Sequence, residues 1–255
     1  MPLATQPHRE TIPSVVNLLQ SPKRVRVVLN GETIVDSRDV LMLRSNHFLP
    51  VYFFPIEAVR PGVLIASGRT GRHRSGDPTA LYALDVKGRR FTDAAWSFAA
   101  PRRDHLAPLE NRIAFDWHAM DAWYEEDEEV FVHARDPYVR VDALQSSAHI
   151  EVVLGGEILA ETRRAVLVFE THLPTRFYIP PDDVRMERLV RSETLTRCPY
   201  KGTASYWSVR MRDGSIRPDV VWDYRDPIPE IPKIKGLLAF YPDAVDQIRL
   251  DGLPA

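Results

Sequence analysis

Two stretches of the chain decide its fold, because one repeats the other. Residues 25–60 read VRVVLNGETIVDSRDVLMLRSNHFLPVYFFPIEAVR, and residues 150–185 read IEVVLGGEILAETRRAVLVFETHLPTRFYIPPDDVR. Over the wider alignment of residues 12–60 with residues 137–185, 14 of the 49 aligned pairs are identical, whereas average amino-acid usage would give about three. A duplication explains this agreement better than coincidence does.

The same register continues toward the end of each copy. Arg72 aligns with Arg197, and after one inserted residue Trp96 aligns with Trp222. The repeat therefore covers nearly the whole chain. We expect an N-terminal tail at residues 1–11, repeat 1 at residues 12–126, an acidic linker at residues 127–136 and repeat 2 at residues 137–255.

Each copy begins with the pattern of a β-hairpin, since a Gly-containing turn separates two short runs rich in β-branched residues. The runs VLMLR (40–44) and AVLVFE (165–170) then predict a third, buried strand. In the second copy, further strands are predicted at Tyr206–Met211 and near Val220–Trp222, with a turn at Asp213-Gly214 between them.

One short helix is expected late in each copy. Its apolar residues recur at helical spacing: Leu106, Leu109 and Ile113 in the first copy, and Ile231, Ile234 and Leu238 in the second. Strands still outnumber helices, and the chain has 21 prolines. We therefore predict a mainly β protein made of two tandem copies of a small barrel-like domain, each with one short helix.

Composition narrows the functional classes. The 255 residues are 44% hydrophobic and 27% charged, as in an average soluble protein. The net charge of −2 provides no global positive field, so neither nucleic acid nor a membrane surface is expected as a partner. Cys198 is the sole cysteine, which excludes an intramolecular disulfide and suits a cytoplasmic location.

Three motifs carry a family resemblance: CPYKGTASYWSV (198–209), FETHLPTRFYIP (169–180) and DPYVRVDALQSS (136–147). With them the chain resembles, over both copies, a bacterial family described as domain of unknown function number 427. The resemblance implies a β-tent-like domain, similar in outline to the zinc-bearing domains of cereblon and methionine sulfoxide reductase B.

Two properties associated with that resemblance do not carry over. The zinc-bearing domains use pairs of CxxC motifs, which a chain with one cysteine lacks. The family is also labelled as nucleotidyltransferases, but the chain lacks the Gly-Ser followed by paired aspartates that would hold two metal ions. Neither a metal nor another cofactor is expected.

The two copies differ in their polar residues. The second copy has Glu170, Arg176, Cys198, Tyr200 and Lys201 where the first has Ser45, Val51, His73, Ser75 and Gly76. A fold needs its core in both copies but needs a polar site in only one. We therefore expect the functional site in the second copy.

The leading hypothesis is a pocket that binds a small molecule. Its expected lining is Glu170, Arg176, Tyr178, Cys198, Tyr200, Lys201 and Trp207. Arg176 and Lys201 would contact anionic or carbonyl oxygens, Glu170 would orient them, and Tyr178 and Trp207 would stack on the ligand. The aromatic residues are equally consistent with core packing.

An enzyme is the first alternative, with Cys198 or Glu170 as the catalytic residue. Lys201, three residues after Cys198, could lower the thiol pKa and produce a nucleophile. The simpler interpretations are a small buried thiol and a structural ion pair of Glu170 with Arg176 or Lys201.

An interaction scaffold is the second alternative, with the acidic run Glu125–Glu129 as a contact surface; a solvated hairpin tip is the simpler interpretation of that run. His47 and His172 share one position in the two copies, which favours packing or a turn over metal ligation. The segment Gly68–Asp77 has glycines and arginines suited to anion binding, or to a solvated loop. Assembly into a homo-oligomer stays open.

Overall fold

The computed structural model describes residues 16–45, 48–74, 76–99 and 104–255. The expected tail at residues 1–11 lies outside these ranges. The chain divides into two compact units, which we call unit 1 (Met1–Asp136) and unit 2 (Pro137–Ala255). Both units are mainly β, as the hydrophobic pattern predicts.

Each unit has eleven strands among its described residues. Those of unit 1 are β1 (Val16–Ser21), β2 (Val25–Leu29), β3 (Glu32–Ser37), β4 (Val40–Ser45), β5 (Val51–Pro55), β6 (Leu64–Arg72), β7 (Pro78–Val86), β8 (Arg89–Phe98), β9 (Arg112–Phe115), β10 (Ala122–Glu125) and β11 (Glu128–Val130). Those of unit 2 are β12 (Val141–Gln145), β13 (Ile150–Leu154), β14 (Glu157–Thr162), β15 (Val166–Glu170), β16 (Arg176–Tyr178), β17 (Leu189–Cys198), β18 (Gly202–Arg210), β19 (Ile216–Pro227), β20 (Leu238–Phe240), β21 (Gln247–Leu250) and β22 (Leu253–Pro254).

The described helices are short 3₁₀ segments, several in each unit. They are η1 (Ile56–Ala58), η2 (Asp104–Leu109), η3 (Trp117–Ala119), η4 (Pro181–Asp183), η5 (Met186–Arg188), η6 (Pro232–Ile234) and η7 (Pro242–Ala244). The apolar residues that predict one helix in each copy do not lie in a single helix. In unit 1 they lie in η2 and β9, and in unit 2 they lie at η6 and in β20. Pro108 lies inside η2, and a proline there cannot donate the backbone hydrogen bond that a longer helix needs.

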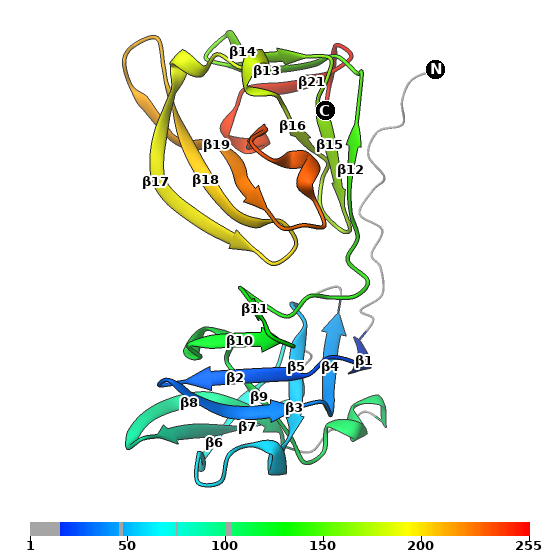
Figure 1. The fold of residues 1–255 in the computed structure, drawn as a ribbon, viewed down its shortest axis with the longest axis vertical. Helices are drawn as coiled ribbons and strands as arrows, with labels where there is room; N and C mark the ends of the chain where they lie inside the picture. The colour runs from blue at the N-terminus through cyan, green and yellow to red at the C-terminus, as the bar shows by residue number, and fades with distance from the viewer. Residues whose placement is uncertain (1–15, 46–47, 75, 100–103) are drawn as a thin grey trace. The chain divides into compact units, whose positions relative to one another are not determined.

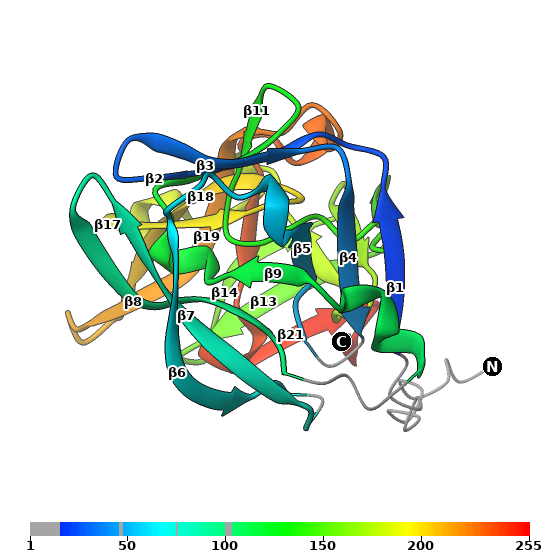
Figure 2. The ribbon, with the colours of Figure 1, turned by 90° about the horizontal axis from the view of Figure 1, so that it is seen from below.

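The two units share one strand order. In unit 1 a seven-stranded antiparallel sheet runs β1-β4-β5-β9-β8-β7-β6 (Figure 2), and a four-stranded sheet runs β11-β10-β2-β3. In unit 2 the groups β12-β15-β16 and β17-β18-β19-β20 are joined by a bridge between Ile179 and Leu238, whose two backbone hydrogen bonds are both 2.8 Å. Phe54 and Ile113 form the equivalent β5–β9 pair in unit 1. Figure 1 shows β17, β18 and β19 as long, curved strands.

The first hairpin of each unit is built in the same way. Its turn is Asn30-Gly31 in unit 1 and Gly155-Gly156 in unit 2, with φ between 50° and 73° at all four residues. Positive φ at both central residues is typical of the type I′ turn, whose twist matches that of antiparallel strands. The hairpins predicted from the sequence are therefore present, as β2–β3 and β13–β14.

The long sheet has a hydrophobic core on each face, because its central strand alternates between them. Tyr52 and Phe54 of β5 lie in what we call the first core, which in unit 2 contains Phe177 and Ile179. Phe53 lies in the opposite, second core. At the equivalent position of unit 2, Tyr178 lies in the second core.

In both units an aspartate accepts a hydrogen bond from the hairpin turn. The repeat therefore predicts that removing either aspartate destabilises its unit by the same amount. Asp121 Oδ2 accepts a hydrogen bond from the Gly31 amide at 2.9 Å, and Asp246 Oδ2 accepts one from the Gly156 amide at 3.2 Å. Asp121→Ala and Asp246→Ala should each reduce the free energy of unfolding of their own unit by about 1 kcal/mol. Hydrogen exchange resolved by peptide measures each unit separately. Destabilisation of one unit only would contradict the equivalence.

Candidate functional site

Glu170 and Lys201 form an ion pair in unit 2. Glu170 ends β15, Lys201 lies in the turn between β17 and β18, and the Lys201 ammonium donates to Glu170 Oε2. Both side chains are only 11% exposed. A carboxylate this buried is stable only when it is paired, and of the two partners considered from the sequence, Lys201 is the one present.

Tyr178 lies in the second core, near enough to Glu170 to feel its charge. It is 1% exposed, and its hydroxyl accepts a hydrogen bond of 3.1 Å from Trp222 Nε1. Burial raises the pKa of Tyr178 far above its ordinary value, and the nearby Glu170 adds to the shift. Tyr178 is therefore neutral at physiological pH and serves as a hydrogen-bond acceptor.

Cys198, Tyr200 and Arg176 lie around the same core. Cys198 ends β17 and is half-buried, and it contributes, after burial, to the raised pKa values of Tyr178 and Tyr224. Tyr200 is half-buried in the turn that carries Lys201. Arg176 begins β16, half-buried, and its charge partly opposes the upward shift in the pKa of Tyr178.

Trp207 does not join this group. Neighbouring residues of a strand point to opposite faces, so Trp207 lies on the other side of β18 from Tyr206. The Arg191 guanidinium lies over the Trp207 ring, 4.1 Å from its centroid. The expected stacking of Tyr178 and Trp207 on one ligand is thus not matched by the strand geometry, since Tyr178 packs against Trp222 instead.

Several residues of the group were not chosen as site residues from the sequence. The Tyr206 hydroxyl lies 2.9 Å from Thr196 Oγ1 and 3.1 Å from the Tyr241 hydroxyl. The Tyr241 ring lies 4.4 Å from that of Trp222. Tyr241 follows the aligned pair Ala239-Phe240, so comparing the copies one residue further would have paired it with Asp116 and drawn attention to it.

The histidines give no metal site in the described part of the chain. No group of three or more His, Cys, Asp and Glu side chains there could hold a metal ion. His172 has a positive φ of 68° in the turn after β15, and His149 Nε2 lies 2.9 Å from Glu161 Oε1. His47 lies outside the described residues. Within the described residues, no helix has the length and apolar character needed to cross a membrane.

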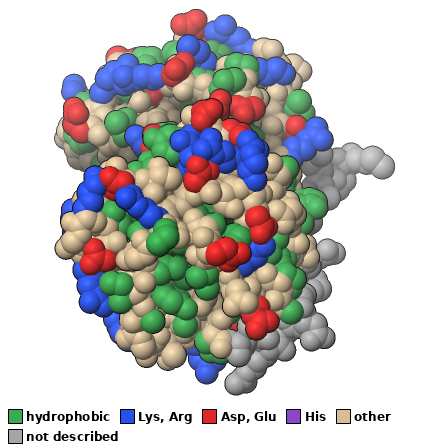
Figure 3. Space-filling model, turned by 60° about the horizontal axis from the view of Figure 1, so that its bottom comes forward, with side chains coloured by type: hydrophobic (Ala, Val, Ile, Leu, Met, Phe, Trp, Pro, Cys, Tyr) green, Lys and Arg blue, Asp and Glu red, His purple; other side chains and the backbone are tan. Residues whose placement is uncertain are grey.

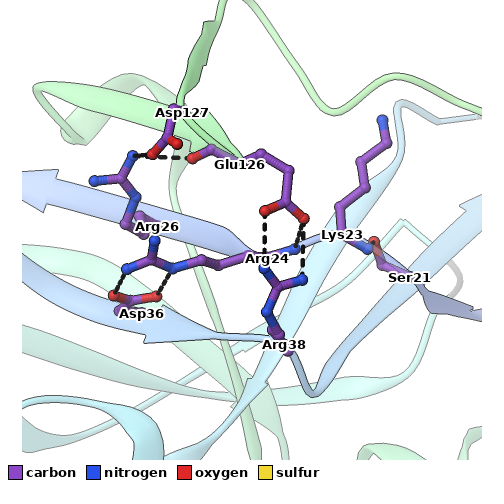
Figure 4. A network of polar contacts seen from close by, with 8 residues as sticks. All are labelled: Ser21, Lys23, Arg24, Arg26, Asp36, Arg38, Glu126 and Asp127. Atoms are coloured by element: carbon purple, nitrogen blue, oxygen red, sulfur yellow. Dashed lines mark hydrogen bonds and ion pairs between the residues drawn. The ribbon is translucent and has the colours of Figure 1, made fainter.

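The acidic run is tied to its own unit. Glu126 accepts hydrogen bonds from the Arg24 amide and the Arg38 guanidinium, and Asp127 pairs with Arg26 at 3.0 Å (Figure 4). β11 pairs with β10, so the expected linker at residues 127–136 begins as a strand of unit 1. These contacts agree with a hairpin tip. On the face drawn in Figure 3, acidic and basic side chains are likewise interspersed.

The residues of the expected site line none of the best-formed hollows in the described part of the chain. Two in unit 2, of about 460 and 410 Å³, are lined mainly by polar and charged residues around Glu161 and Asp183. One of about 400 Å³ in unit 1 is lined by His73 and Trp96, the counterparts of Cys198 and Trp222.

Comparison with known proteins finds one family. The family model described as Domain of unknown function (DUF427) matches residues 17–126 and again residues 142–251. One match falls in each unit, which confirms both the duplication and the resemblance seen in the motifs. No curated protein matches the chain.

The buried ion pair predicts a large penalty for removing one partner. Glu170→Gln should reduce the free energy of unfolding of unit 2 by about 3 kcal/mol, because the Lys201 ammonium would stay buried without its carboxylate. The double variant Glu170→Gln, Lys201→Met should recover most of that loss, since unit 1 folds with Ser45 and Gly76 at these positions. Peptide-resolved hydrogen exchange checks both. A double variant less stable than either single variant would contradict this account.

The buried Asp223 of β19 predicts that the stability of the folded protein depends on pH. It is 5% exposed, and burial raises its pKa although the nearby Arg191 opposes the shift. A raised pKa in the folded state means that Asp223 weakens stability increasingly as the pH rises above the ordinary aspartate pKa. Asp223→Asn should therefore raise the melting temperature at pH 7, and the gain should shrink toward pH 4.

A second aspartate of unit 2, whose pKa is shifted in the opposite direction, provides the control. Asp213 is exposed, and hydrogen bonds from Ser215 lower its pKa. Asp213→Asn should not raise the melting temperature at pH 7. Equal gains at pH 4 and pH 7 for Asp223→Asn would refute the role assigned to its charge.

Proposed function

The chain belongs to the DUF427 family, which is described without a function, and from the geometry of unit 2 we propose that it binds a small molecule carrying an oxyanion. The site is the rim of the second core, formed by Arg176, Thr196, Tyr206 and Tyr241. The proposal depends on one observation. Among the described residues, no side chain or backbone group pairs with the Arg176 guanidinium.

A half-buried arginine without a partner is suited to an incoming anion. Arg176 lies at the start of β16, where Val51 stands in unit 1. Its guanidinium can donate two parallel hydrogen bonds to a carboxylate or a phosphate, and such charged hydrogen bonds are about twice as strong as neutral ones. The neighbouring Glu170 does not neutralise it, because Lys201 pairs with that carboxylate.

A group of hydroxyls that includes Tyr241, on which the charge of Arg176 acts, can supply further polar contacts. Thr196, Tyr206 and Tyr241 form a hydrogen-bonded chain with distances of 2.9 and 3.1 Å. Burial raises the pKa of Tyr241, as does its hydrogen bond to Tyr206, and Arg176 partly opposes that shift. Tyr241 therefore stays neutral at physiological pH and can donate a hydrogen bond to a ligand oxygen.

The exposed ring of Tyr241 adds a flat surface. It is 37% exposed and rests on Trp222, so one of its faces is supported from below. A ligand that combines an oxyanion with a flat portion would meet the guanidinium and this ring together. Glu170, Lys201 and Tyr178 then act as the support that holds the rim in place rather than as direct contacts.

The test is a binding measurement with inorganic phosphate, succinate and AMP. At least one of these probes should raise the melting temperature and bind in calorimetry. Arg176→Gln should raise the Kd of that probe at least about tenfold, as expected for loss of a charged hydrogen bond.

Arg210→Gln is the matched control, since Arg210 is exposed at the far end of β18 and its removal changes the net charge equally. It should leave the Kd unchanged. The proposal fails if none of the three probes binds at about 10 mM, or if Arg176→Gln and Arg210→Gln bind equally well.

A further inference from the structure

We propose that unit 1 has a ligand site of its own, a hollow that takes a flat aromatic molecule with a negative charge. The hollow has a volume of about 400 Å³, in the range of small-molecule sites. It lies between the start of β5 and the strands β6, β7 and β8. Its lining comprises Phe48, Leu49, Val51, Gly71, Arg72, His73, Arg74, Thr79, Leu81 and Trp96.

Aromatic rings form one wall of the hollow. The His73 ring is stacked on that of Trp96, with centroids 5.2 Å apart and an angle of 22° between the planes. Phe48 meets His73 edge-on at 4.8 Å. Burial lowers the pKa of His73, so the ring is neutral at pH 7 and acts as an aromatic surface rather than as a charge. Such a wall favours a flat, unsaturated ligand.

The mouth of the hollow is positively charged. Arg72 and Arg74 are both exposed, and none of the described lining residues is acidic. One guanidinium nitrogen of Arg72 donates a hydrogen bond of 2.9 Å to the Gly76 carbonyl. This bond orients the side chain and leaves its other donors for a ligand. An anionic group on the ligand is therefore favoured over a neutral or cationic one.

Comparison of the units explains why the hollow exists. Leu81 lies opposite Trp96 across β7 and β8, where unit 2 has Tyr206 opposite Trp222. Asp116 follows the aligned Phe115, where unit 2 has Tyr241 after Phe240. In unit 2 these two tyrosines pack together and Tyr241 covers Trp222, which is 6% exposed. Unit 1 keeps the tryptophan and lacks both tyrosines, and its tryptophan lines the hollow.

The test uses 1-naphthoate and its neutral counterpart 1-naphthamide. Calorimetry on the full chain should show that 1-naphthoate binds with a Kd of about 1 mM or below, as expected for a ligand of its size. Naphthamide should bind at least about threefold more weakly. Leu81→Tyr, which places in unit 1 the residue that unit 2 has, should weaken naphthoate binding at least about tenfold.

Surface variants keep the test decisive even if Leu81→Tyr misfolds. Arg74→Gln should weaken naphthoate binding about threefold, whereas Arg90→Gln, an equally exposed charge at the other end of β8, should not change it. Arg176→Gln should also leave it unchanged, which separates this site from the one proposed in unit 2. The proposal is overturned if naphthoate does not bind, if the amide binds equally well, or if Arg74→Gln and Arg90→Gln have the same affinity.

Discussion

The pairing of the central strands, β5 with β9 and β16 with β20, is the constraint on which each unit depends. These strands are buried on both faces, and they join the two halves of the long sheet through the pairs Phe54–Ile113 and Ile179–Leu238. A slip of one residue would exchange the residues of the first and second cores. The register is therefore strongly specified, which explains why the two copies keep the same strand order.

Because the strand register is the same in both units, the units can differ in the side chains on one face of the long sheet. The first core is mostly aliphatic in both units, as in Val27 and Val152. The second core is apolar around Phe53 in unit 1 but contains several tyrosines around Tyr178 in unit 2. A single added hydroxyl, from Phe53 to Tyr178, is tolerated because Trp222 supplies its hydrogen bond.

This difference has opposite consequences for the two proposed sites. In unit 2 the hydroxyl groups of Tyr206 and Tyr241 lie within hydrogen-bond distance and Tyr241 covers Trp222, so the site proposed there is the rim with Arg176, which is unpaired among the described residues. In unit 1 Trp96 lines a hollow with an aromatic wall, and this hollow is the site proposed there. One fold thus offers a polar rim in one copy and an apolar recess in the other.

The sequence alone determined the duplication, the hairpins with their Gly turns, the mainly β class and the need of Glu170 for a cation. Each follows from a local pattern or from the cost of burying an unpaired charge. The apolar spacing predicted one short helix in each copy, whereas the structure has several 3₁₀ segments, because such spacing ignores that Pro108 has no backbone donor. Only the tertiary structure decided that Trp207 faces away from Tyr178, that Tyr241 covers Trp222, and that the open hollow is in unit 1. These outcomes depend on which strand faces meet across the sheet and on how completely side chains fill the space between them, and neither is encoded at one position of the chain.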